Sequence, residues 1–312
     1  MPVIDIHEHL ILRPAFVRPS RGETVVTAEE LVEVMDREGI DQMVALPATS
    51  PETFPFVQSN EEVFQACDEH PGRFIKFCNV DPRLENNRLQ FSFVDILSYY
   101  KSVGAKGLGE LTANLWWDDP RVQNLLRGCE EVGFPIIFHI TGQEFNTYGL
   151  VTEPGLGGLE RALQRFPKLQ LIGHSPGFWS EVAPHPGSQR NGYPKGEVKL
   201  GGRVPELLRT YPSLWGDLSA GSGWNALARD PEWGYEFIDE FQDRLLMGLD
   251  ICWPSGRKRC RLLGLLREAV EDKKITRRAY NKIMGGNAVK LLKLRSRTGK
   301  KKSKKKAARK KA

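Results

Sequence analysis

Two histidines near the start of the chain have the spacing of a metal-ligand pair. His7 and His9 close an apolar segment that begins at Val3, and we expect this segment to be a β-strand. Residues i and i+2 of a strand face the same side, so the two imidazoles converge. Imidazole nitrogen is a common ligand for divalent transition metals. The pair indicates half of a metal site, although two surface histidines at a fraying terminus would give the same pattern.

Two of the other four histidines follow the same rule of position. Of six histidines in the chain, His139 and His174 each end an apolar segment, and Asp250 ends another. By contrast, His70 follows a helical segment and His185 lies in a long loop. Chance placement would scatter histidines over helices and loops. The strand-end histidines and Asp250 therefore predict one shared metal site.

Short apolar segments alternate along the chain with segments of helical period. Eight strands are expected at residues 2–7, 42–47, 74–80, 105–111, 135–141, 169–174, 214–219 and 244–250. Helix-start signals lie between them, such as the capping box that begins at Thr27 and the proline at position 120. This alternation predicts an α/β protein with a (β/α)8 TIM barrel. The competing doubly wound sheet would need a glycine-rich loop after its first strand, where this chain has His-Glu-His-Leu.

The barrel frame brings the polar residues together. The C-terminal ends of the strands in such a barrel share one site, and Glu110 ends the fourth expected strand. A polar connection of unusual length runs from Pro176 to Lys199. Because it exceeds an ordinary βα loop, we expect it to lie over the mouth of the barrel.

In their order along the chain, these motifs resemble the amidohydrolase superfamily, specifically the amidohydrolase-related branch that includes aminocarboxymuconate-semialdehyde decarboxylase. The resemblance covers nearly all of residues 2–292 and is specific for the superfamily, but not for a substrate. The residues that carry it are Asp5-Ile6-His7-Glu8-His9, Phe138-His139-Ile140-Thr141-Gly142, Ile172-Gly173-His174-Ser175-Pro176-Gly177, Gly248-Leu249-Asp250 and, in the closing helices, Gly285-Gly286-Asn287-Ala288.

The resemblance implies a divalent metal, with zinc expected first and manganese or iron as alternatives. Its ligands would be His7, His9, His139 and Asp250, and a bound water would be the nucleophile. Asp250 would also take the proton of that water. His174 would polarise a substrate carbonyl, act as an acid or base, or bind a second ion.

Glu110 stands where many relatives carry a carboxylated lysine that bridges two metals. A glutamate can bridge two cations directly, in which case His139 and His174 would bind the second ion. Alternatively, Glu110 lies outside the ligand set and orients a ligand imidazole. Sites with one ion and with two ions therefore remain open, with Glu110 expected among the metal ligands.

The leading function is metal-dependent hydrolysis of a C–N, C–O or lactone bond in a small molecule. A decarboxylase of the same family is the runner-up, because both reactions use the same ligands. Candidate substrate contacts are Arg13 and Trp116, which follow the first and fourth strands, and Ser219 at the end of the seventh. The loop that contains Ser219 could bind an anion or equally cap a helix. Asp5 is expected to orient a histidine.

Composition is that of an ordinary globular protein. The 312 residues include 40% hydrophobic ones, enough for a large core, and no apolar run approaches the ~20 residues of a membrane span. We expect no secretory signal, because a basic region followed by an apolar segment is lacking at the N-terminus, and the five cysteines show no CxxC spacing. We therefore expect a cytoplasmic protein with reduced thiols and no membrane association. A homo-oligomer is compatible with these features.

The net charge of +6 comes from the end of the chain. Residues 293–312 contain twelve lysines and arginines and no acid, which leaves 33 basic against 39 acidic residues in 1–292. We expect one barrel domain over 1–294 and a disordered lysine-rich tail over 295–312. The tail could contact polyanions without sequence preference. A nucleic-acid-associated protein recruited by this tail is the alternative from a different functional class.

A chain that ends at Leu294 should keep the melting temperature and turnover of the full chain. Ordering a residue costs about 1–2 kcal/mol, and the lysines of the tail have no apolar area to offset that cost. Any polyanion affinity should be lost with the tail and, in the full chain, should fall steeply with salt. If truncation lowers the melting temperature or turnover, the tail contributes to the barrel and the boundary at residue 294 is wrong.

Overall fold

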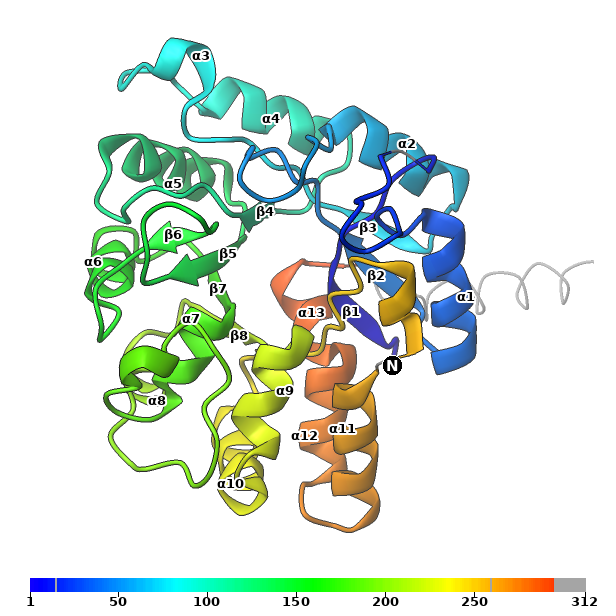
Figure 1. Cartoon of the computed structure of the whole chain (residues 1–312), viewed down its shortest axis with the longest axis vertical. Helices are drawn as coiled ribbons and strands as arrows, with labels where there is room; N and C mark the ends of the chain where they lie inside the picture. Colours follow the sequence, from blue (N-terminus) through cyan, green and yellow to red (C-terminus); the bar gives the residue numbers. More distant parts are fainter. Residues whose placement is uncertain (15, 259, 295–312) are drawn as a thin grey trace, which may run out of the picture.

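The computed structural model describes residues 1–14, 16–258 and 260–294, in which parallel strands form a ring surrounded by helices (Figure 1). The lysine-rich tail predicted over 295–312 lies outside the described residues. All eight expected strands are present, each shorter than its apolar segment. They are β1 Ile4–Glu8, β2 Gln42–Ala45, β3 Phe74–Lys76, β4 Leu108–Leu111, β5 Ile136–Thr141, β7 Leu171–His174, β8 Leu214–Asp217 and β9 Leu245–Leu246; a short strand, β6 Leu150–Val151, adds to β5.

Main-chain hydrogen bonds close the ring. The sheets β1-β2-β3 and β4-β5-β7-β8-β9 are parallel throughout. Between β3 and β4, the Cys78 amide donates to the Gly107 carbonyl at 3.0 Å and the Gly109 amide donates to the Cys78 carbonyl at 2.9 Å. Between β9 and β1, the Ile6 amide donates to the Met247 carbonyl at 2.9 Å. The predicted (β/α)8 barrel is confirmed.

The helices begin where the sequence provides caps. The Thr27 hydroxyl accepts from the Glu30 amide, the Glu30 carboxylate accepts from the Thr27 amide, and Pro120 opens α5. These interactions satisfy amide groups that have no partner within the helix. The helices are α1 Ala28–Glu38, α2 Asn60–Glu69, α3 Leu84–Asn87, α4 Val94–Ser102, α5 Pro120–Val132, α6 Gly157–Arg165, α7 Pro176–Trp179, α8 Arg203–Thr210, α9 Ala220–Ala228, α10 Pro231–Phe241, α11 Arg261–Glu271, α12 Arg277–Asn281 and α13 Asn287–Leu291, with short turns η1 Ser180–Val182, η2 Gly187–Gln189, η3 Pro254–Lys258 and η4 Lys282–Gly286.

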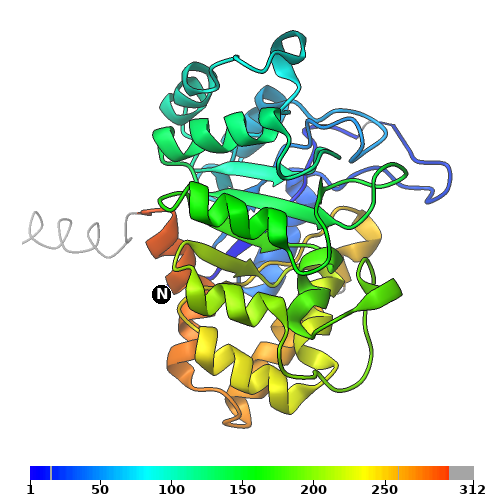
Figure 2. The ribbon, with the colours of Figure 1, turned by 90° about the vertical axis from the view of Figure 1, so that its left-hand side faces the viewer.

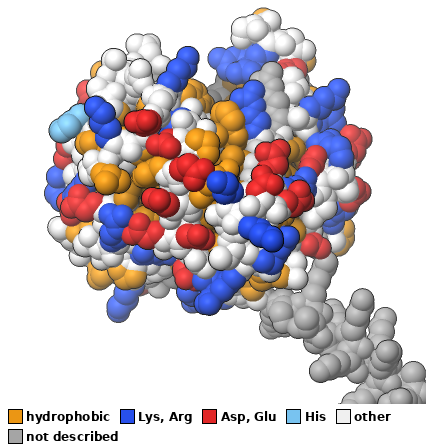
Figure 3. Space-filling view, turned by 90° about the horizontal axis from the view of Figure 1, so that it is seen from below, with side chains coloured by type: hydrophobic (Ala, Val, Ile, Leu, Met, Phe, Trp, Pro, Cys, Tyr) orange, Lys and Arg blue, Asp and Glu red, His pale blue; other side chains and the backbone are white. Residues whose placement is uncertain are grey.

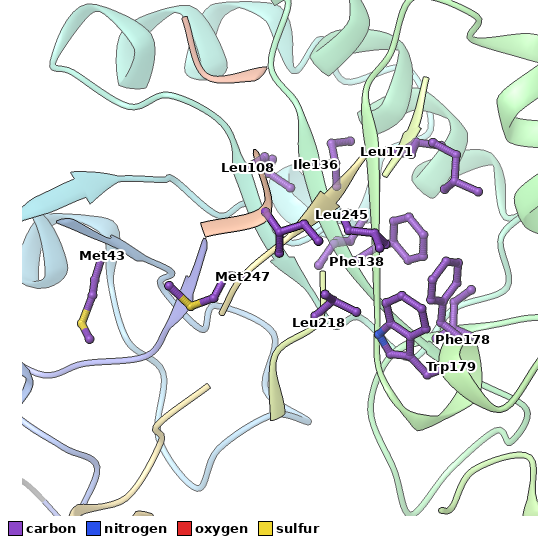
Figure 4. Close-up of a cluster of buried hydrophobic side chains, with 14 of the residues drawn as sticks. Met43, Leu108, Ile136, Phe138, Leu171, Phe178, Trp179, Leu218, Leu245 and Met247 are labelled. Carbon is purple, nitrogen blue, oxygen red and sulfur yellow. The ribbon is translucent and has the colours of Figure 1, made fainter. Parts of the chain in front are cut away.

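The strands separate two apolar clusters, because alternate side chains of a strand point to opposite faces. The outer cluster joins the strands to the helices, and Figure 4 shows Phe138 of this layer beside Phe178 and Trp179 of α7. The inner cluster fills the barrel below the site. It consists of Ile4, Ile6, Val44, Leu46, Ile75, Phe77, Ile137, Ile172, Trp215 and Leu246, together with Ala288, Leu291 and Leu292 of the closing segment.

The two ends of the barrel differ. The N-terminus and α13 lie at one end, and the long connections that follow the strands gather at the other (Figure 2). The segment from Pro176 to Lys199 begins with the short helix α7 and therefore is not loop throughout. Asn191 and Tyr193 of this segment line a cavity together with Asp250. The segment thus lies over the mouth of the barrel, as predicted.

Acidic and basic side chains are interspersed on the face of the barrel seen from below (Figure 3). Among the described residues, no helix combines the length and apolarity that crossing a bilayer requires. The five cysteines, all within the described part of the chain, form no disulfide. Burial raises the pKa of the Cys67 thiol to about 12, which keeps that thiol protonated at neutral pH.

Candidate metal centre

His7 and His9 converge as their spacing predicts. The Nε2 atoms of the two rings lie 3.3 Å apart, and both side chains are buried. Two ligands of one tetrahedral zinc ion lie roughly 3.4 Å apart, given zinc–nitrogen bonds of about 2.1 Å. The spacing of the two imidazoles therefore suits a shared metal ion.

A shift of strand register brings this pair to the inside of the barrel. Ile4 and Ile6 belong to the inner cluster, so a regular strand would direct the odd-numbered residues outward. The pairing of β1 with β2 changes register between Asp5 and Glu8. A change of register by one residue reverses the faces of a strand. The histidines consequently face the same interior as the isoleucines below them.

Glu110 lies at the centre of the cluster and divides it into two pairs of histidines. Its Oε2 atom lies 3.7 Å from His7 Nε2 and 3.3 Å from His9 Nε2. Its Oε1 atom lies 2.7 Å from His139 Nδ1 and 3.7 Å from His174 Nε2. Each oxygen of one carboxylate therefore faces a different pair of imidazoles, which is the arrangement expected of a bridging ligand.

Asp250 closes the cluster from the segment that follows β9. Its Oδ1 atom lies 3.8 Å from His7 Nε2, and its Oδ2 atom lies 3.7 Å from His174 Nε2. The Asp250 amide donates to the His7 carbonyl at 3.0 Å. Its φ of 57° is in the left-handed region, which few non-glycine residues adopt outside functional sites and turns. The Cys252 thiol donates to Oδ1 over 3.1 Å.

Two of the rings are held at Nδ1 and turn Nε2 toward the cluster. His7 Nδ1 lies 2.7 Å from the Asp217 carboxylate, and His9 Nδ1 lies 2.9 Å from the Leu46 carbonyl. A carbonyl accepts only, so His9 carries its proton on Nδ1 and leaves Nε2 as a lone pair. Lone pairs and carboxylates gathered around one point in a buried space need a cation between them. The donor set therefore fits a divalent metal such as zinc or manganese.

The charges of the cluster depend on one another. Burial raises the pKa of Glu110, but His139, His7 and His9 outweigh burial and hold that pKa well below its usual range. Burial lowers the pKa of His7, but the carboxylates of Asp250 and Asp217 outweigh burial and raise it well above its usual range. Glu110 is therefore ionised and able to bind a cation.

A cavity of about 190 Å³ opens onto this cluster. Phe54 packs edge-on against His9, with ring centroids 5.5 Å apart, and forms part of the wall. Arg18 and Arg21, from the connection between β1 and α1, also line it. A second cavity of about 490 Å³, lined by Trp224 and other residues, also reaches Asp250. The cluster is thus accessible to a small molecule.

The three predicted substrate contacts do not line the cavities at the cluster. The Arg13 guanidinium lies 3.4 Å from a Glu69 oxygen, outside the described cavities. The side chain of Trp116 is also outside them, and its indole donates to Glu144. Ser219 is fully buried, with Oγ 3.0 Å from His174 Nδ1, so it orients a histidine instead. None of these positions supports the predicted contact with substrate.

Sequence reasoning overlooked other site residues. Asp217 ends an apolar strand as the candidate ligands do, and that position was a usable signal. Tyr148 packs on the His139 ring at 4.5 Å between centroids, and no sequence signal marks it. Asp5 accepts from the amides of His7 and Leu249, so it orients main chain and not an imidazole.

Comparison with known proteins agrees with this architecture. A family described as Amidohydrolase matches residues 4–294. No curated protein matches the sequence. Among solved structures, an uncharacterized TIM-barrel protein from Bordetella bronchiseptica shares 19% identity, with 94% of this chain and 98% of that chain covered and a TM-score of 0.63.

Two further similar structures contain metals. A dihydroxybenzoic acid decarboxylase from Polaromonas sp. JS666, with bound manganese and an inhibitor, is 16% identical, with 95% and 98% of the two chains covered and a TM-score of 0.57. An amidohydrolase from Burkholderia multivorans with bound zinc is 14% identical, with 95% and 100% covered and a TM-score of 0.59. At these identities, the likeness shows a common fold.

Proposed function

Because the chain belongs to the amidohydrolase family, we propose that it is a metal-dependent hydrolase acting on a C–N, C–O or lactone bond of a small molecule. The proposal rests on the Glu110 carboxylate, whose two oxygen atoms face different pairs of histidines. One ion would be held by His7, His9 and Asp250, and a second by His139 and His174. Glu110 would bridge the two ions.

The reaction follows from the positions of the side chains. A bound zinc or manganese ion supplies Lewis acidity, which polarises a substrate carbonyl and lowers the pKa of water. Asp250 accepts the proton of the attacking water and passes it to the leaving group. Its carboxylate lies beside the cavities and is 17% exposed, so both water and substrate can reach it. Phe54 covers one side of His9 with an apolar ring.

A decarboxylase is the second candidate, and the two arginines in the cavity favour it. Arg18 and Arg21 have no acidic partner among the described residues, while Arg21 stacks on Trp253 at 4.7 Å. Guanidinium groups bind carboxylates in bidentate fashion. A substrate that carries a carboxylate would therefore be attracted to this cavity, as a decarboxylase requires.

Metal analysis tests the bridging carboxylate directly. The purified full chain should contain, or take up after chelator treatment, two equivalents of zinc or manganese. Glu110→Gln should lose at least one equivalent, because a neutral amide bridges two cations poorly. Glu232→Gln, a matched change at an exposed glutamate paired with Lys274, should keep both. A wild-type chain that binds no zinc, manganese or iron would contradict the proposal.

The reaction class requires a substrate panel. Lactones, amides and carboxylated phenols should be offered to the metal-loaded chain, with product analysis for hydrolysis and for released carbon dioxide. Hydrolysis of lactones or amides would support the leading proposal. Release of carbon dioxide alone would replace it with the decarboxylase.

A further inference from the structure

Asp217 connects two imidazoles that come from different parts of the site. Its Oδ2 atom lies 2.7 Å from His7 Nδ1 and 3.2 Å from His174 Nδ1. Its Oδ1 atom accepts from the Ser219 amide at 2.9 Å. The carboxylate has no exposed surface, and the centroids of the two rings lie 4.3 Å apart. One buried oxygen thus faces the outer nitrogens of two candidate ligands.

Asp217 lies on the Nδ1 side of both rings; at His174 it shares this position with the Ser219 hydroxyl, 3.0 Å from Nδ1. A carboxylate hydrogen-bonded to Nδ1 keeps the proton there and leaves Nε2 as the ligand atom. His7 Nε2 faces Oε2 of Glu110, whereas His174 Nε2 faces Oε1. If the proposed two-ion centre is correct, the two rings therefore belong to different ions.

We propose that Asp217 is a positioning residue shared by both metal positions. Its loss should therefore weaken the binding of both ions and not of one alone. The inference rests on the proposed two-ion centre. The other two ligand histidines are held differently: His9 Nδ1 is bound by the Leu46 carbonyl, and His139 Nδ1 faces Glu110. Asp217 consequently couples the two positions through rings on β1 and β7.

Ser219 provides a matched variant that affects one position. Its hydroxyl lies 3.0 Å from His174 Nδ1, and the hydrogen bonds of the described residues place it on neither His7 nor His9. Removing this hydroxyl leaves the contact between Asp217 and His7 intact. Ser219→Ala should therefore weaken the binding of only one ion, the one held by His174.

The test is zinc binding by the full chain, measured after chelator treatment by competition with a chromophoric chelator. Wild type should bind two equivalents. Asp217→Asn keeps the shape of the side chain but removes its charge, and it should weaken the affinity for each of the two zinc ions by about 10–100-fold. Ser219→Ala should weaken the affinity for only one of the two ions. Circular dichroism and the melting temperature of the metal-free proteins establish that each variant is folded.

A measurement on wild type covers the case in which Asp217→Asn does not fold. Long-range ¹H–¹⁵N spectra of the zinc-loaded protein should show His7 and His174 bound through Nε2, with protons on Nδ1. Zinc on Nδ1 of either ring would overturn the shared role of Asp217, as would an Asp217→Asn chain with one or both affinities unchanged. Wild type that binds fewer than two equivalents would instead overturn the two-ion centre itself.

Discussion

Replacing Asp250 by asparagine is expected to lower turnover by about 10²–10⁴-fold while the barrel stays folded. The substitution removes the proton acceptor but keeps the size of the side chain. Asparagine also tolerates the left-handed conformation of this position, where φ is 57°. Most of the metal should remain, because His7 and His9 are unchanged. Turnover of the best substrate from the panel, together with metal content, measures the effect.

Asp243→Asn is the matched control for this prediction. Asp243 is an exposed aspartate paired with Lys282, and it has no part in the proposed chemistry. Its amide variant should keep wild-type turnover. Turnover of Asp250→Asn within a few-fold of wild type, with metal bound, would remove Asp250 from the proposed chemistry.

Replacing Arg190 by methionine should destabilise the protein by about 3–5 kcal/mol, because it leaves a buried charge without its partner. The Arg190 guanidinium donates to Glu181 at 3.0 Å and to the carbonyls of Thr152 and Glu153 at 2.8 Å each. Arg190 and Glu181 are both buried. These bonds join the segment over the mouth to the connection that follows β5. Urea unfolding of the metal-free protein measures the free-energy change.

An exposed ion pair provides the comparison. Arg209 of α8 contacts Glu240 of α10 through two hydrogen bonds, and both side chains are largely exposed. Arg209→Met should therefore change the free energy of unfolding by no more than about 1 kcal/mol. Equal losses for the two variants would show that burial does not determine the contribution of Arg190.

Local sequence determined much of this protein. Apolar segments and helix caps depend on neighbouring residues, so the eight strands and the helix starts at Thr27 and Pro120 were predictable. His139 and His174 each follow an inward-facing residue by two positions, in regular strands, and their convergence followed from that period. The family resemblance added the expectation of a metal.

Tertiary structure alone decided three features. The register changes at β1 and β4 set how Glu110 meets its two pairs of histidines, and register depends on pairing with a neighbouring strand. Asp217 can reach both His7 and His174 only because the barrel brings the ends of β1, β7 and β8 close together. The course of the connection after β1 places Arg18 and Arg21 at the cavity and Arg13 outside it. Local propensity does not specify that course, because contacts between residues distant in sequence hold the loop in place.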